Sequence, residues 1–169
     1  MKKLSILLIA LLLVAFTCTG ASALLKVSAL GAYYSYNGGS LTGYGLQVSL
    51  PIIPLLDTNV EAIMCPGTSG GVNYSFMPIT LNAEFGIPMT SFYLGGGVGT
   101  ALFNATGVTI PTPIIYNVHA GYRHNLAPLV SAFIQAGYEV INMTVTTGTL
   151  PLPHNLSGFS VKGGIGFGL

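Results

Sequence analysis

Three histidines, His119, His124 and His154, are the residues of this chain best suited to acid–base chemistry. Hydrolysis by a side-chain nucleophile needs a base beside that nucleophile and a third group that orients the base. His154 lies near Ser157, but the segment 146–156 contains no acidic residue that could orient it. No His or carboxylate residues show metal-ligand spacing, and no phosphate-binding glycine loop is present. We therefore expect no catalytic residue, no metal site and no cofactor.

The charged residues are unusually few. They make up 5% of the chain, whereas 51% of its residues are hydrophobic. An ordinary soluble domain has roughly 25% charged residues, and a surface in water needs far more charge than this chain can supply. Nucleic-acid binding is also disfavoured, because it requires a clustered basic surface.

The first 23 residues have the layout of a cleaved signal peptide. Lys2 and Lys3 precede the apolar run 4–16, and the small residues 21–23 supply a cleavage site. The run is shorter than the ~20 residues of a membrane-spanning helix. We expect export, with a signal peptide at 1–23 and one domain at 24–169. Cys65 is then the only cysteine of the mature chain, and we interpret it as an unpaired loop thiol.

The domain must be built of strands, because apolar and polar residues alternate with a period of two. No apolar run of 18 residues follows the leader. In the segment 114–123, for example, Tyr116, Val118 and Ala120 alternate with Asn117 and His119. We predict eight strands, at 25–36, 43–50, 58–64, 77–87, 92–103, 114–123, 130–145 and 159–169.

The charges are sorted onto one face of these strands, and Asp57 is placed in a connector. The apolar face carries no charge, as expected if it contacts lipid. Within lipid every strand edge must be paired, so the sheet must close. We therefore predict an all-β, eight-stranded antiparallel up-and-down transmembrane barrel. The inward-facing charges form a predicted lumen ion-pair network of Lys26, Glu61, Glu84, Arg123, Glu139 and Lys162.

The connectors alternate in length, which predicts the orientation. The longer ones, 37–42, 65–73, 105–112 and 146–156, are the predicted outer loops, and 51–57, 88–91 and 124–128 are the predicted periplasmic turns. Outward aromatic residues should gather at the two membrane interfaces. The predicted outer girdle is Tyr33, Tyr44, Tyr116 and Phe159. The predicted periplasmic girdle is Phe85, Phe92, Tyr122 and Phe167.

These features resemble the small eight-stranded outer-membrane barrels of the outer membrane protein A transmembrane-domain, X-type and opacity-protein kind. The resemblance covers residues 24–169 and is sharpest in the last strand. That strand looks like the C-terminal assembly signal of the family, carried here by Phe159, Val161, Ile165, Phe167 and Leu169. The family usually ends in Phe, and this chain ends in Leu. The resemblance implies a monomer in the Gram-negative outer membrane, with outer-membrane lipid and the barrel-assembly machinery as partners.

The lumen of such a barrel is about narrow enough for side chains to fill it. We expect Lys26, Glu61, Glu84 and Arg123 in its periplasmic half, with Glu139 and Lys162 nearer the middle. A set of inward glycines should make room for Tyr34, Tyr36, Tyr93 and Phe133. These glycines are Gly95, Gly97, Gly99, Gly164, Gly166 and Gly168.

The expected function is a non-enzymatic structural, envelope-integrity or surface-interaction role with a plugged, porin-like barrel. The first alternative is a narrow channel or carrier for a small solute. The second is a lipid-modifying enzyme, because some barrels of this size modify lipid A. The chain shows no His-x-Ser arrangement like that of the lipid A deacylases.

Overall fold

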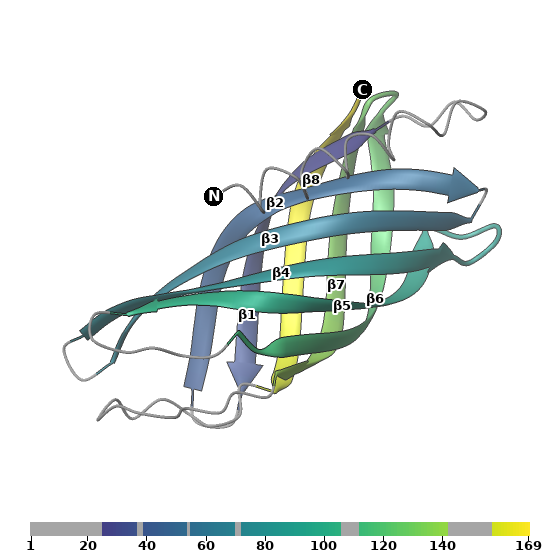
Figure 1. Cartoon of the computed structure of the whole chain (residues 1–169). Helices are drawn as coiled ribbons and strands as arrows, with labels where there is room; N and C mark the ends of the chain where they lie inside the picture. The colour runs from purple at the N-terminus through teal and green to yellow at the C-terminus, as the bar shows by residue number, and fades with distance from the viewer. Residues whose placement is uncertain (1–24, 37–38, 54, 70–71, 106–111, 142–156) are drawn as a thin grey trace, which may run out of the picture.

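The computed structural model describes residues 25–36, 39–53, 55–69, 72–105, 112–141 and 157–169. Eight antiparallel strands close into a barrel in sequence order (Figure 1). The strands are β1 (Lys26–Tyr36), β2 (Gly39–Ile53), β3 (Leu56–Ser69), β4 (Val72–Gly86), β5 (Phe92–Ala105), β6 (Ile114–Ala127), β7 (Val130–Ile141) and β8 (Gly158–Gly168). The barrel closes where β1 pairs with β8, from Lys26 opposite Gly168 to Tyr36 opposite Gly158. The predicted fold class is confirmed.

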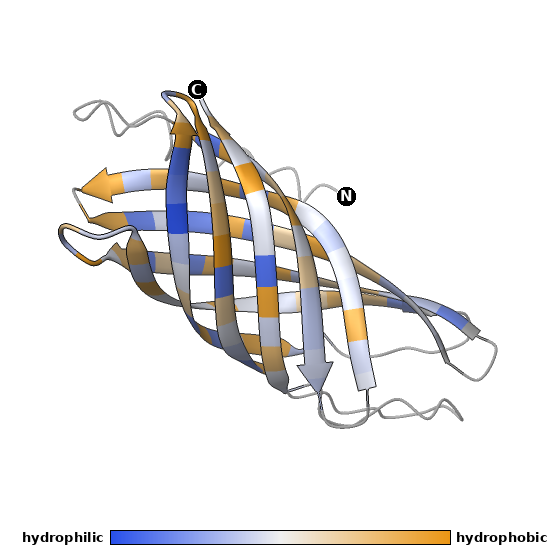
Figure 2. Ribbon diagram, turned by 180° about the vertical axis from the view of Figure 1, so that it is seen from behind, coloured by the Kyte–Doolittle hydropathy of each residue, from blue (hydrophilic) through white to orange (hydrophobic). Residues whose placement is uncertain are grey.

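The alternation of residue types explains why these segments form strands with two different faces. In β6, exposed and buried residues alternate strictly from Ile114 to Tyr122. Figure 2 shows the same alternation as changing bands of hydropathy along the ribbons. The outward positions carry Leu, Val, Ile, Phe and Tyr, whereas the strand pairing satisfies the backbone groups. No helix in the described part of the chain is long and apolar enough to cross a membrane.

The two ends of the barrel differ. We call the end with the first residue of β1, the last residue of β8 and the three short turns the turn end, and the opposite end the loop end. Two non-glycine residues with positive φ shape the turns: Leu55 (φ 75°) between β2 and β3, and Met89 (φ 63°) between β4 and β5. In the second turn the amide of Ile87 donates to the carbonyl of Phe92 at 2.9 Å.

Several predicted connectors were wrong because the strands continue through them. β2 begins at Gly39, and the β3–β4 ladder runs from Leu56 opposite Phe85 to Ser69 opposite Val72. Most residues of the Gly- and Pro-containing segment 65–73 are thus paired between β3 and β4, since cross-strand contacts override the local turn preferences of Gly and Pro. The predicted turns 51–57 and 124–128 are mostly strand as well, which places Asp57 in β3 and His124 in β6. The predicted leader, most of the loop 105–112, the loop 146–156 and the strand extension 142–145 lie outside the described residues.

The interior has two zones. Towards the loop end it is largely apolar, and Phe76, Ile63, Ile115 and Ile141 there are at most 2% exposed. Towards the middle and the turn end it is polar and charged. The sequence pattern predicted the polar zone but not the apolar one, because period-two alternation assigns faces without locating residues along the barrel axis.

Candidate functional site in the barrel lumen

Lys162 on β8 lies at the centre of the buried charges. Its Nζ atom is 2.5 Å from Oε1 of Glu61 on β3 and 2.8 Å from Oε1 of Glu139 on β7. All three side chains are at most 4% exposed. Because β1 and β2 separate β8 from β3, the Lys162–Glu61 contact crosses the lumen. The Nζ atom also lies 5.6 Å from the ring centroid of Tyr34 on β1. We call these four residues the central cluster.

A second set of charges lies nearer the turn end, around Arg123 on β6. Its guanidinium donates to Oδ2 of Asp57 at 2.7 Å and to Oε2 of Glu84 at 2.6 Å. Asp57 on β3 and Glu84 on β4 are register partners on adjacent strands, and Arg123 joins both of them to β6. The guanidinium carbon lies 4.9 Å from the ring centroid of Tyr93. We call Arg123, Asp57, Glu84 and Tyr93 the Arg123 cluster.

A row of buried amides is connected to Glu84. Asn59 donates to Oε1 of Glu84 at 2.7 Å, Asn82 donates to Asn59 at 2.8 Å, and Asn117 donates to Asn82 at 2.8 Å. His119 Nδ1 is 2.9 Å from Oδ1 of Asn117. Since an amide oxygen can only accept, Nδ1 is the donor in this contact. Side chains from β3, β4 and β6 are thereby hydrogen-bonded across the interior.

The predicted lumen charges are only partly brought together. Glu61, Glu139 and Lys162 meet in the central cluster, and Glu84 meets Arg123. Glu61 therefore pairs with the middle group and not with the charges nearer the turn end, where it was placed. Lys26 makes no ion pair with any described residue.

Two features of the interior, the position of Asp57 and the row of amides, could not be placed by the sequence pattern. The assignment of Asp57 to a connector was wrong, because β3 extends through it and Arg123 binds it. The amide row was missed: Asn59, Asn82 and Asn117 were all on the inward face, but only the strand register shows that they are neighbours.

The inward glycines do leave room for large side chains, although mostly not for the expected ones. A Cβ atom on Gly164 would lie 2.8 Å from the ring of Phe133, one of the expected aromatic residues. Gly95 and Gly97 instead accommodate the side chains of His119 and Asn82. The ring of Tyr93 lies over Gly121, a glycine that the sequence analysis did not select.

The predicted girdle residues all face outward. Their exposed fractions run from 38% for Tyr122 to 69% for Phe159. Near the turn end the rings of Phe92 and Tyr122 pack edge to face with their centroids 5.2 Å apart. Near the loop end Phe159 and Tyr138 pack in the same way, also with centroids 5.2 Å apart. Tyr138 is an additional outward aromatic residue, 40% exposed. The residues of the predicted assembly signal also point outward, namely Phe159, Val161, Ile165, Phe167 and Leu169.

The remaining reactive side chains occupy separate places. His124 is in β6 and not in a turn, and its ring stacks on Tyr122 with centroids 6.3 Å apart. His154 lies outside the described residues. The interpretation of Cys65 as a loop thiol was wrong: it is in β3, 0% exposed, in the apolar zone. Within the described ranges no three His, Cys, Asp or Glu residues are grouped to hold a metal ion.

Comparison with known proteins gives structural likeness alone. No protein-family model matches the chain, and no curated protein matches it. Among solved structures, Neisserial surface protein A is similar with a TM-score of 0.66 and 16% identity, over 88% of this chain and 98% of that one. The outer membrane protein OprG of Pseudomonas aeruginosa is similar with a TM-score of 0.58 and 12% identity, over 88% and 96%. Ail of Yersinia pestis is similar with a TM-score of 0.56 and 13% identity, over 86% and 99%.

The likeness spans nearly the whole of each of these proteins and agrees with the closed strand order. The chain therefore has the fold of the small eight-stranded outer-membrane β-barrels.

Proposed function

We propose that this protein is a non-enzymatic barrel of the bacterial outer membrane, with a structural, envelope-integrity or surface-interaction role and a lumen closed by its own side chains. The contact of Lys162 with Glu61 and Glu139 carries the proposal. One ammonium group holds carboxylates on β3 and β7, and nearer the turn end Arg123 on β6 holds carboxylates on the adjacent strands β3 and β4. Two charged layers and the apolar zone then stand in series along the lumen.

The outward surface supports a membrane location. Leu46, Leu81, Val98, Val118 and Ile165 are each about half exposed or more. In water such a surface would favour association, whereas hydrocarbon lipid accommodates it. None of the charged strand residues in the described ranges points outward.

The surroundings of His119 support a non-enzymatic role. Its polar contacts within the described residues are Asn117, at 2.9 Å, and Glu84, at 3.6 Å. The side chain is 5% exposed and contacts one member of the amide row and one member of the Arg123 cluster. Neither of these two partners is a hydroxyl or thiol that a base could activate, as acyl hydrolysis would require.

Conductance tests the closed lumen. The purified barrel is refolded into liposomes, its insertion is checked by protease protection and heat-modified gel mobility, and it is then fused to a planar bilayer. We expect no steady current, because buried ion pairs close the path at two levels. A reproducible open current from inserted, folded protein would instead establish the narrow-channel alternative.

A further inference from the structure

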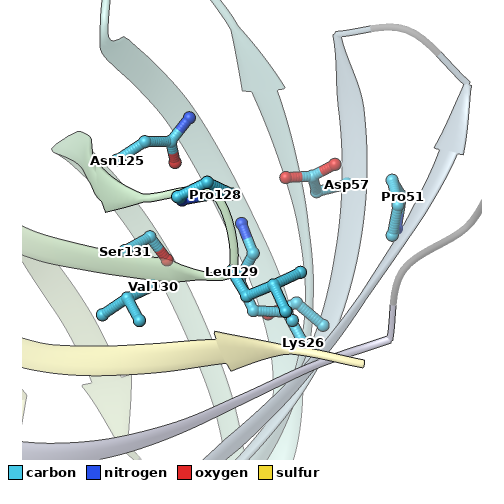
Figure 3. Close-up of a pocket in the computed structure, with 10 residues that line it drawn as sticks. Lys26, Pro51, Asp57, Asn125, Pro128, Leu129, Val130 and Ser131 are labelled. Atoms are coloured by element: carbon cyan, nitrogen blue, oxygen red, sulfur yellow. The ribbon is translucent and has the colours of Figure 1, made fainter.

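A pocket of about 240 Å³ opens at the turn end of the barrel. It is formed where the start of β1, the end of β8 and the β6–β7 turn face the beginning of β3. Figure 3 shows Lys26 projecting its amino group towards the space between Pro128 and Asp57. A space of this size holds several waters of about 30 Å³ each, or one molecule the size of a short-chain carboxylate.

The polar lining of this pocket is rich in donors. Lys26 lines it and makes no ion pair with a described residue. Ser49 also lines it; the residue is 3% exposed, and its Oγ atom has no hydrogen-bond partner within the described part of the chain. Ser131 and Asn125 add a hydroxyl and an amide. A buried hydroxyl without a partner is costly, and a ligand oxygen in the pocket would satisfy it.

The sign of the ligand charge follows from the neighbouring ion pairs. Asp57 is the carboxylate that lines the pocket, and its Oδ2 atom already accepts from Arg123 at 2.7 Å. The Arg123 guanidinium in turn forms ion pairs with both Asp57 and Glu84. Lys26 is therefore the cation left without a counterion among the described residues, and it favours an anion. The other wall is apolar and consists of Pro51, Pro128, Leu129 and Val130.

We propose that this pocket is a binding site for a small carboxylate with a short apolar tail. Lys26 pairs with the carboxylate, Ser49 donates to one of its oxygens, and the tail lies against Pro128 and Leu129. The site goes beyond the proposed function, because it requires only the folded barrel.

Titration of sodium butyrate into the isotope-labelled barrel in detergent micelles, followed by NMR, tests the site. We expect saturable shifts of the Ser131 and Gly168 amides with butyrate. The neutral analogue butyramide should produce none, because it offers Lys26 no charge. Absence of saturable butyrate binding, or equal binding of butyramide, would overturn the proposal.

Two variants and one control locate the binding. Lys26→Met should weaken butyrate binding by about tenfold or more, as expected for loss of a charged hydrogen bond. Ser49→Ala should weaken it by about threefold to tenfold and provides a second test if Lys26→Met folds poorly. Ser28→Ala is the matched control, because Ser28 is equally buried but does not line the pocket. Unchanged binding in Ser49→Ala, or an equal loss in Ser28→Ala, would contradict the assigned site.

Discussion

Lys162 is the one cation between two acidic side chains, Glu61 and Glu139. Its ammonium faces two carboxylates, and Oε2 of Glu61, Oε2 of Glu139 and the Tyr34 hydroxyl have no hydrogen-bond partner among the described residues. Buried charges are stable only while they remain paired. The central cluster should therefore be highly sensitive to loss of its one cation.

Lys162→Ala should lower the free energy of unfolding by about 3–5 kcal/mol, the usual cost of removing one partner of a buried ion pair. Urea unfolding in lipid vesicles, followed by heat-modified gel mobility, measures this. Ser160→Ala is the control, because Ser160 is also buried on β8 but carries no charge. If Lys162→Ala unfolded at the same midpoint urea concentration as the wild type, Lys162 would not be what holds the cluster together.

At the level of the strands, small residues on one strand make room for large ones on the next. Tyr93 on β5 lies over Gly121 on β6, where the two residues are register partners. Its hydroxyl donates to Oε1 of Gln135 on β7 at 3.0 Å. The absence of a side chain at Gly121 thus allows a tyrosine to reach across one strand to the next.

Gly121→Ala should destabilise the barrel by about 1–3 kcal/mol, because the added methyl group would overlap the Tyr93 ring. Gly163→Ala is the matched control, since its Cβ atom would meet nothing closer than the Phe133 carbonyl oxygen at 3.5 Å. The same urea titration compares the two variants. If the contact with the Tyr93 ring is the cause, Gly121→Ala should no longer lower the free energy of unfolding in a Tyr93→Ala background. A loss of stability that persists in that background would show that the backbone at Gly121 is the cause instead.

The whole molecule reverses the arrangement of a soluble protein. The charged side chains and a row of amides of the described strands are inside, whereas large apolar side chains cover the outside. In the proposed membrane location, the outward residues between the two aromatic girdles face hydrocarbon, and those beyond them face the lipid headgroups. This difference in depth predicts different costs for the same substitution.

Val118→Arg should cost about 2–4 kcal/mol in lipid vesicles, and Leu126→Arg about 0–1 kcal/mol. Both residues are on β6, 65% and 58% exposed. Val118 is outward within the alternating part of the strand, whereas Leu126 is at the rim next to the β6–β7 turn. Reversible unfolding from vesicles measures both values. Equal, small costs would indicate that this surface meets water and would contradict the membrane location.

Within the strands that it predicted, the sequence by itself determined which way the residues point. Alternation is a local property, so Glu84, Lys162 and Tyr116 could be assigned to a face from their immediate neighbours alone. The charge-free outward face then required a closed barrel in lipid, and the closed barrel is confirmed. Where Gly and Pro interrupt the alternation, as around Asp57 and Cys65, the local signal failed and the strand bounds were wrong.

Only the tertiary structure decided which inward residues meet. Lys162 and Glu61 are 101 residues apart in the chain, and their contact depends on how β8 and β3 are staggered around the closed barrel. The same stagger assigns Asp57 to Arg123 and leaves Lys26 beside an open pocket. Alternation carries no information about height along the barrel axis, because a shift of two residues preserves every face and changes every partner.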